Sequence, residues 1–176
     1  MIRASRREAM MGALAVPTLA GLPQWRWQHG EASLLLHDPA LAAGRRFAAA
    51  GTARGGQVVA LAGDRIRQTR QLLAANPALV AGVSLAADAL LVEEVAAEAG
   101  YTRVALFTGS GGSCAAEVCH PGWAALGRMA QGAGASWVEA LAAYAAAPGG
   151  LGTAPVATRA PADGASVLGW VLAARA

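Results

Sequence analysis

The sequence predicts an α/β fold, with one compact, doubly wound, mainly parallel sheet of about five strands and helices on both faces. Short apolar runs rich in Leu, Val and Ala alternate along the chain with longer segments of helical periodicity. Gly, Pro and Asp stand between these segments, where turns and helix ends need them. Strands and helices that alternate at this spacing form strand–helix–strand units whose helices cover both faces of a parallel sheet.

Five apolar runs are the expected strands, and each is bounded by turn residues. They are 33–37, 57–62, 78–85, 103–108 and 166–173. The expected helices are 39–50, 65–75, 86–99 and a long Ala-rich region at 122–147, which Gly132 and Gly134 should break into two. Asp38 and Asp64 are placed to cap the first two helices, and Gly100 to end the third. That third helix is apolar at Leu90, Leu91 and Val95 and acidic at Glu93, Glu94 and Glu98, a pattern that predicts a helix with one buried face.

The first twenty residues have the organisation of an export leader. A short basic start precedes the uncharged, weakly apolar run 11–22, which is too short to span a bilayer but suits a signal peptide. Small residues follow, so cleavage is expected near Ala20. The predicted organisation is therefore a leader at 1–20, a linker at 21–32 and a single α/β domain at 33–176.

The segment Ser5-Arg6-Arg7-Glu8-Ala9-Met10-Met11 resembles the twin-arginine motif of export signals. The Ser and the Arg pair match that motif, whereas Ala9 replaces its usual aromatic residue and Met11 its frequent Lys. The resemblance covers only the leader. It implies export to the periplasm in the folded state, often with a cofactor or a partner protein.

Charge and hydropathy exclude two classes of partner. The formal net charge is only +3, every basic residue is Arg, and the leader supplies most of the excess. The rest of the chain therefore lacks the clustered positive charge that nucleic acids require. No later stretch has about twenty residues rich enough in Leu, Ile, Val and Phe to span a membrane.

Polar residues near the carboxyl ends of the expected strands form the first candidate site, because ligands of parallel sheets bind at that edge. These residues are His37, Asp38, Asp64, Ser84 and Ser110. Each also has a structural interpretation, since both aspartates suit helix caps and His37 suits an exposed loop. Ser110 belongs to the Gly-rich run 109–113, which lacks the Lys of a phosphate-binding loop and is better interpreted as a flexible loop.

Cys114 and Cys119 are the only cysteines, and His120 follows them directly. In a chain sent to an oxidising compartment, a disulfide between the two cysteines is the first expectation. An alternative is attachment of haem c, because Cys119-His120 resembles the end of that motif in a rare form with four residues between the cysteines. A second alternative is a transition-metal site formed by Cys114, Cys119 and His120 with a further ligand.

Two functional hypotheses follow. The first is a non-catalytic periplasmic module that binds a small ligand or another exported protein and needs no cofactor, since no nucleophile, carboxylate pair or complete metal set is recognisable. The second is a redox, metal or haem protein centred on Cys114, Cys119 and His120. The five Trp residues could form a docking surface, although core positions are the commoner use of Trp. Whether the protein is an enzyme is left open by the sequence.

Overall fold

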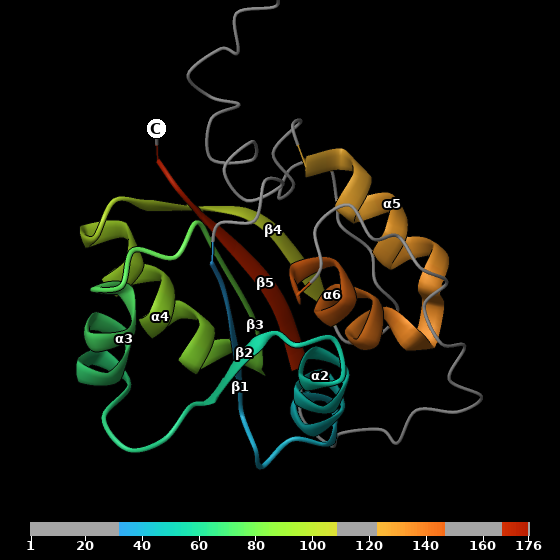
Figure 1. Ribbon diagram of the computed structural model, residues 1–176, viewed down its shortest axis with the longest axis horizontal. Helices are drawn as coiled ribbons and strands as arrows, with labels where there is room; N and C mark the ends of the chain where they lie inside the picture. The colour runs from blue at the N-terminus through green and yellow to red at the C-terminus, as the bar shows by residue number, and fades with distance from the viewer. Residues whose placement is uncertain (1–31, 109–122, 147–166, 176) are drawn as a thin grey trace, which may run out of the picture.

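The computed structural model describes residues 32–108, 123–146 and 167–175 (Figure 1). Its α/β fold is organised around one five-stranded sheet with the strand order β2-β1-β3-β5-β4. The strands are β1 (Ser33–His37), β2 (Gln57–Ala60), β3 (Leu79–Leu85), β4 (Tyr101–Thr108) and β5 (Val167–Ala174). All five expected strands therefore exist, each within two residues of its expected bounds.

Helices cover both faces of the sheet, as expected (Figure 1). One face carries α2 (Ala42–Thr52), α5 (Ala124–Ala133) and α6 (Trp137–Ala146), and the other carries α3 (Arg65–Leu73) and α4 (Ala86–Glu98). The break between α5 and α6 is the short 3₁₀ helix η4 (Gly134–Ser136), whose first residue has a φ of 52°. The Gly at this position allows that backbone conformation.

The expectation of a mainly parallel sheet is wrong, because the sheet is mixed. β1 runs parallel to both β2 and β3, but β5 is antiparallel to both β3 and β4. In a strand–helix–strand unit, one helix carries the chain back to the end of the sheet where the first strand began, so the next strand runs parallel to the first. Two helices and the segment 147–166 lie between β4 and β5 instead, and Val167 begins beside Leu85, at the carboxyl end of β3.

The strands divide their side chains between two apolar cores, one on each face of the sheet. Leu35, on β1, lies in the core beneath α2 and α6, whereas Leu34 and Leu36 lie in the core beneath α3 and α4. β5 pairs with a strand on either side, and its buried residues are divided between the two cores. The alternation of Leu34, Leu35 and Leu36 between the two cores is the period-two pattern of a strand that is covered on both faces.

Two glycines admit the largest side chains of these cores. A Cβ at Gly82 would lie 2.1 Å from the ring of Trp170, and one at Gly169 would lie 2.3 Å from the ring of Trp137. Trp123 is buried as well. These three Trp residues are therefore core residues, while Trp25 and Trp27 lie outside the described residues.

Helix α2 begins later than expected, and Asp38 does not cap it. The Asp38 carboxylate accepts a hydrogen bond from the Ala40 backbone N–H at 2.9 Å, which closes a tight turn before the helix. The residue before α2 is Leu41, which provides no side-chain cap. Asp64 does cap α3, accepting from the Arg67 N–H at 3.1 Å. Gly100 has a φ of 87°, as a residue that ends a helix in the left-handed region should.

None of the helices in the described part of the chain has the length and apolar character needed to cross a membrane.

Candidate functional site

The carboxyl ends of β1, β2 and β3 do share one edge of the sheet, as the candidate site requires. His37 pairs in register with Ala60 on one side and with Val83 on the other. By strand alternation, His37 points to the α2 side of the sheet, the same side as Leu35. Its Nδ1 is buried without a hydrogen-bond partner in the structure, and burial lowers the pKa of His37 more than the neighbouring Asp38 raises it.

Asp38 and Asp64 have structural partners at this edge. Asp38 is buried, its backbone N–H donates to the Val83 carbonyl at 3.0 Å, and its carboxylate accepts from Ala40. Asp64 is more exposed, and its carboxylate is the cap of α3. The structure therefore places both carboxylates where backbone N–H groups use them.

Ser84 lies on the opposite side of the sheet from His37. Its side chain is fully buried, donates to the Leu85 carbonyl at 3.1 Å and accepts from Nε1 of Trp170 at 3.1 Å. The edge therefore brings His37 and Asp38 together as chain neighbours, but Ser84 is directed into the other core. Within the described residues, no three His, Cys, Asp or Glu side chains lie close enough to hold a metal ion.

Four candidate residues lie outside the described part of the chain. They are Ser110, Cys114, Cys119 and His120. The disulfide, the haem attachment and the metal site that the sequence suggested at these positions remain predictions.

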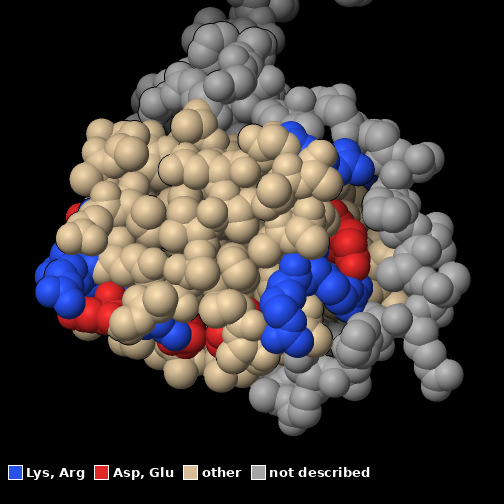
Figure 2. Space-filling model, turned by 60° about the horizontal axis from the view of Figure 1, so that its bottom comes forward, with Lys and Arg blue, Asp and Glu red and all other residues tan. Residues whose placement is uncertain are grey.

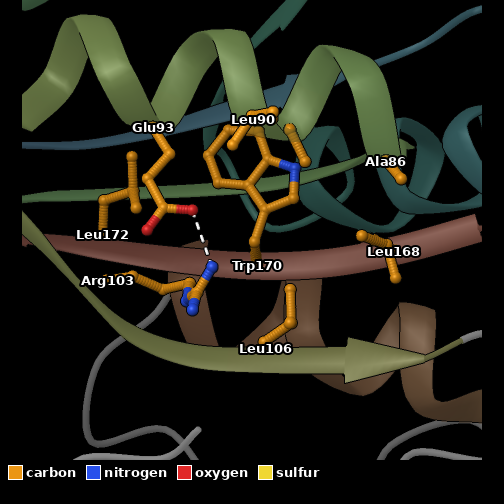
Figure 3. Close-up of a pocket in the computed structure, with 9 residues that line it drawn as sticks. Ala86, Leu90, Glu93, Arg103, Leu106, Leu168, Trp170 and Leu172 are labelled. Atoms are coloured by element: carbon orange, nitrogen blue, oxygen red, sulfur yellow. Dashed lines mark hydrogen bonds and ion pairs between the residues drawn. The ribbon is translucent and has the colours of Figure 1, made fainter.

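A different site, which we call the α4–β4 groove, lies on the face covered by α3 and α4 (Figure 3). It is an open hollow of about 240 Å³ between α4 and the outer strand β4. Its lining is mostly apolar, and its charged members are Glu93 and Arg103. The lining residues are Ala86, Ala89, Leu90, Glu93, Arg103, Leu106, Leu168, Trp170 and Leu172.

One side of the groove is apolar, and the other side holds an ion pair. Trp170 rises from β5 toward α4, and Leu106 and Leu168 stand beside it (Figure 3). On the other side, Arg103 donates from Nη1 to Glu93 Oε2 at 2.7 Å, so β4 and α4 are joined by an ion pair. This pair neutralises the charges nearest the groove. The rest of the groove offers apolar contact.

Sequence reasoning missed this groove because the pattern of this helix predicted one buried face, with Leu90 and Leu91 among its apolar residues. In the structure Leu90 is 58% exposed and Leu91 is 41% exposed, whereas α4 buries Ala89, Val92, Val95 and Ala96. Small Ala side chains at two of those buried positions let the helix lie close to the sheet. A signal was present: apolar residues occur all round α4, more than one buried face requires.

Charge is not concentrated on the face that Figure 2 shows. Acidic and basic side chains form mixed groups at its two sides, with a broad uncharged surface between them. Ion pairs between described residues include Arg46–Glu139 at 2.6 Å and Arg65–Asp88 at 3.1 Å.

Comparison of the chain with models of known protein families, with curated proteins and with solved structures finds no match.

Proposed function

We propose that this protein is a binding module that receives an apolar side chain of a partner protein in the α4–β4 groove. The observation that carries the proposal is the exposure of Leu90 beside an apolar hollow floored by Trp170, Leu168 and Leu172. When a partner covers large aliphatic side chains that are exposed beside an apolar hollow, apolar surface is removed from water and binding is favoured.

The size of the groove favours a protein partner over a free small molecule. Sites for small molecules and cofactors usually enclose about 300–1,000 Å³ and surround most of the ligand. The groove is smaller, at about 240 Å³, and it is open. A hollow of this size suits one large side chain anchored on another surface, in the manner of a central interface contact.

We also propose that the module works in the periplasm after export through the twin-arginine route. The support is the leader, in which Arg6 and Arg7 precede the weakly apolar run 11–22. Replacing both arginines by lysine should leave the protein in the cytoplasmic fraction of a bacterial host, with the leader uncleaved. Unchanged export of that variant would refute the route.

The groove can be tested with an apolar fluorescent probe, anilinonaphthalene sulfonate, added to the folded full-length protein at micromolar concentration. We expect saturable binding by the wild-type protein and at least about tenfold weaker binding by Leu90→Glu, because a carboxylate would stand at the rim of the apolar hollow. Leu91→Glu is the matched control, since Leu91 follows on the same helix, is also exposed and does not line the groove.

The outcomes of this experiment are distinct. Binding that is lost in Leu90→Glu and kept in Leu91→Glu supports the groove as the binding surface. No saturable binding by the wild-type protein would reject the proposal, as would equal binding by the wild-type protein and Leu90→Glu. Circular dichroism of each variant verifies that it is folded.

A further inference from the structure

The outermost strands of the described sheet, β2 and β4, have outer edges that differ. β2 has only four residues, and the side chain of Gln68 closes the carboxyl end of its outer edge. The Gln68 amide donates to the Ala60 carbonyl at 2.8 Å and accepts from the Ala62 N–H at 3.0 Å. Both backbone groups point away from β1, because the N–H of the intervening Leu61 donates to the His37 carbonyl. The β2 edge therefore offers little free backbone to another strand.

The hydrogen bonds of β5 show which of its residues face β4. The Ala174 N–H donates to the Ala78 carbonyl on the β3 side, whereas the Arg175 N–H donates to the Gly100 carbonyl on the β4 side. Since this direction alternates along a strand, the odd-numbered residues of β5 bond to β4. Gly169 is one of these residues.

The outer edge of β4 carries backbone groups that the described sheet does not use. β4 has eight residues, and β5 is the only described strand that pairs with it. Phe107 pairs with Gly169, so its N–H and C=O groups bond inside the sheet. Leu106 and Thr108, on either side of Phe107, therefore direct their N–H and C=O groups to the outer edge.

The usual protections of an edge strand are weak in this part of β4. The strand contains no proline, and its one charged residue, Arg103, is paired with Glu93 at 2.7 Å. The register is irregular between Arg103 and Ala105, but it is continuous from Ala105 to Thr108. The end of β4 is thus a regular edge at which another strand can pair.

This edge lies beside the α4–β4 groove (Figure 3). Leu106 belongs to both, because its side chain lines the groove and its backbone groups face outward. A residue of an added strand that pairs with Leu106 has its side chain on the same face of the sheet, which is the face that α4 covers. A long apolar side chain at that position extends over Leu106 toward Leu90 and Trp170, which also line the groove.

We propose that the partner of the groove binds as an extended segment of another protein, which adds a strand to the outer edge of β4. Its backbone pairs with Leu106 and Thr108, and its apolar side chain beside Leu106 enters the groove. In this mode of recognition the main chain provides affinity and the pocket selects alternate side chains, so the partner segment alternates apolar and polar residues. The inference rests on the proposed function, because this side chain is the one that the groove is proposed to receive.

Short fluorescein-labelled peptides test the inference by fluorescence anisotropy with the folded full-length protein. In these peptides threonine alternates with leucine, valine, phenylalanine or tryptophan, and we expect saturable binding of at least one. Thr108→Pro should weaken that binding at least about tenfold, because proline removes the outward N–H and obstructs an approaching strand. Thr108→Val is the matched control, since it keeps the N–H, and it should bind like the wild-type protein. Thr108 does not line the groove, so both variants should bind anilinonaphthalene sulfonate normally.

Methylation of the peptide backbone tests the same hydrogen bonds without changing the protein. Two versions of the bound peptide carry N-methyl groups on alternate residues, one version along each edge of the extended chain. The version methylated on the edge that faces β4 should lose binding, and the other version should keep it, since only one edge pairs with the sheet. Equal affinity of the two versions would overturn the added strand.

The proposed function and this inference fail separately. If anilinonaphthalene sulfonate binds but no peptide does, the added strand is overturned and the proposed function stands. The same conclusion follows if Thr108→Pro and Thr108→Val bind the peptide equally well. If the wild-type protein does not bind anilinonaphthalene sulfonate, the proposed function is rejected and this inference with it.

Discussion

Nε1 of Trp170 donates a hydrogen bond to Oγ of Ser84 at 3.1 Å, and both side chains are buried. The bond joins β5 to β3 beneath α4 and gives the indole N–H the partner that it needs away from water. It also orients the ring that floors the α4–β4 groove.

Ser84→Ala should destabilise the protein by about 1–3 kcal/mol, because it leaves the buried indole N–H without an acceptor. Urea denaturation measures the change in the free energy of unfolding. A double-mutant cycle with Trp170→Phe isolates the hydrogen bond, and we expect a coupling energy of about 1 kcal/mol. Additive effects of the two substitutions would show that the bond contributes nothing.

Gly82→Ala should cost about 1–3 kcal/mol, since its Cβ would lie 2.1 Å from the Trp170 ring and force that ring to move. The same urea experiment measures this loss. Gly132→Ala serves as the comparison, because it lies in α5 with nothing within 4 Å of the added Cβ. In a helix this second change should be neutral or stabilising. If both variants were equally stable, the packing of Trp170 against Gly82 would not matter.

Stability should depend on pH through His37. Burial lowers the pKa of His37 in the folded state below its ordinary value of 6.5, so the unfolded chain binds a proton more readily. The free energy of unfolding therefore has its full His37-dependent part above pH 6.5. This part is lost as the pH falls from 6.5 to the folded-state pKa, because the unfolded chain is protonated first. Denaturation midpoints measured across this range should decline toward acid in the wild-type protein.

His37→Gln provides the control for that decline. The chain also contains His29 and His120, so the part of the pH dependence that disappears in His37→Gln is the part due to His37. An identical pH profile for this variant would contradict the assignment.

The phenol of Tyr144 should ionise at a higher pH than an exposed tyrosine. Burial raises the pKa of its phenol to about 12 from the model-compound value of 10.0. Because the unfolded chain releases this proton first, stability is full below pH 10 and decreases as the pH rises from 10 toward 12. The ultraviolet absorbance of tyrosinate follows the titration, and its difference from Tyr144→Phe isolates this residue. Ionisation near pH 10 in the folded protein would disagree with the burial of Tyr144.

The sequence identifies the elements of this fold better than their arrangement. Period-two and helical patterns depend on local burial, so every expected strand is found and the helical region at 122–147 breaks where Gly132 and Gly134 indicate. The direction of a strand relative to its neighbours produces no comparable pattern in the sequence. The run at 166–173 is apolar because both of its faces are buried, and it would be equally apolar in a parallel or an antiparallel position.

The candidate site is harder to predict for a related reason. A polar residue at a strand end has the same sequence environment whether it binds a ligand, as the sequence suggested for His37, or accepts from a backbone N–H, as Asp64 does. The groove beside Leu90 is lined by residues of α4, β4 and β5. It depends on the relative positions of one helix and two strands, which a pattern within one helix does not record.

The position of β5 has a consequence for the order of biosynthesis. Among the described strands, β5 comes last in the chain yet is an inner strand, so β3 and β4 lack their shared neighbour until Val167–Ala174 has left the ribosome. The sheet can then close only after β5 has been synthesised, through contacts between residues far apart in the chain. A ribosome that stalled before Val167 would release a chain with two unpaired inner edges, which is a form prone to aggregation. An export route that carries folded proteins, as the twin-arginine resemblance implies, would allow this late step to be completed before the protein leaves the cytoplasm.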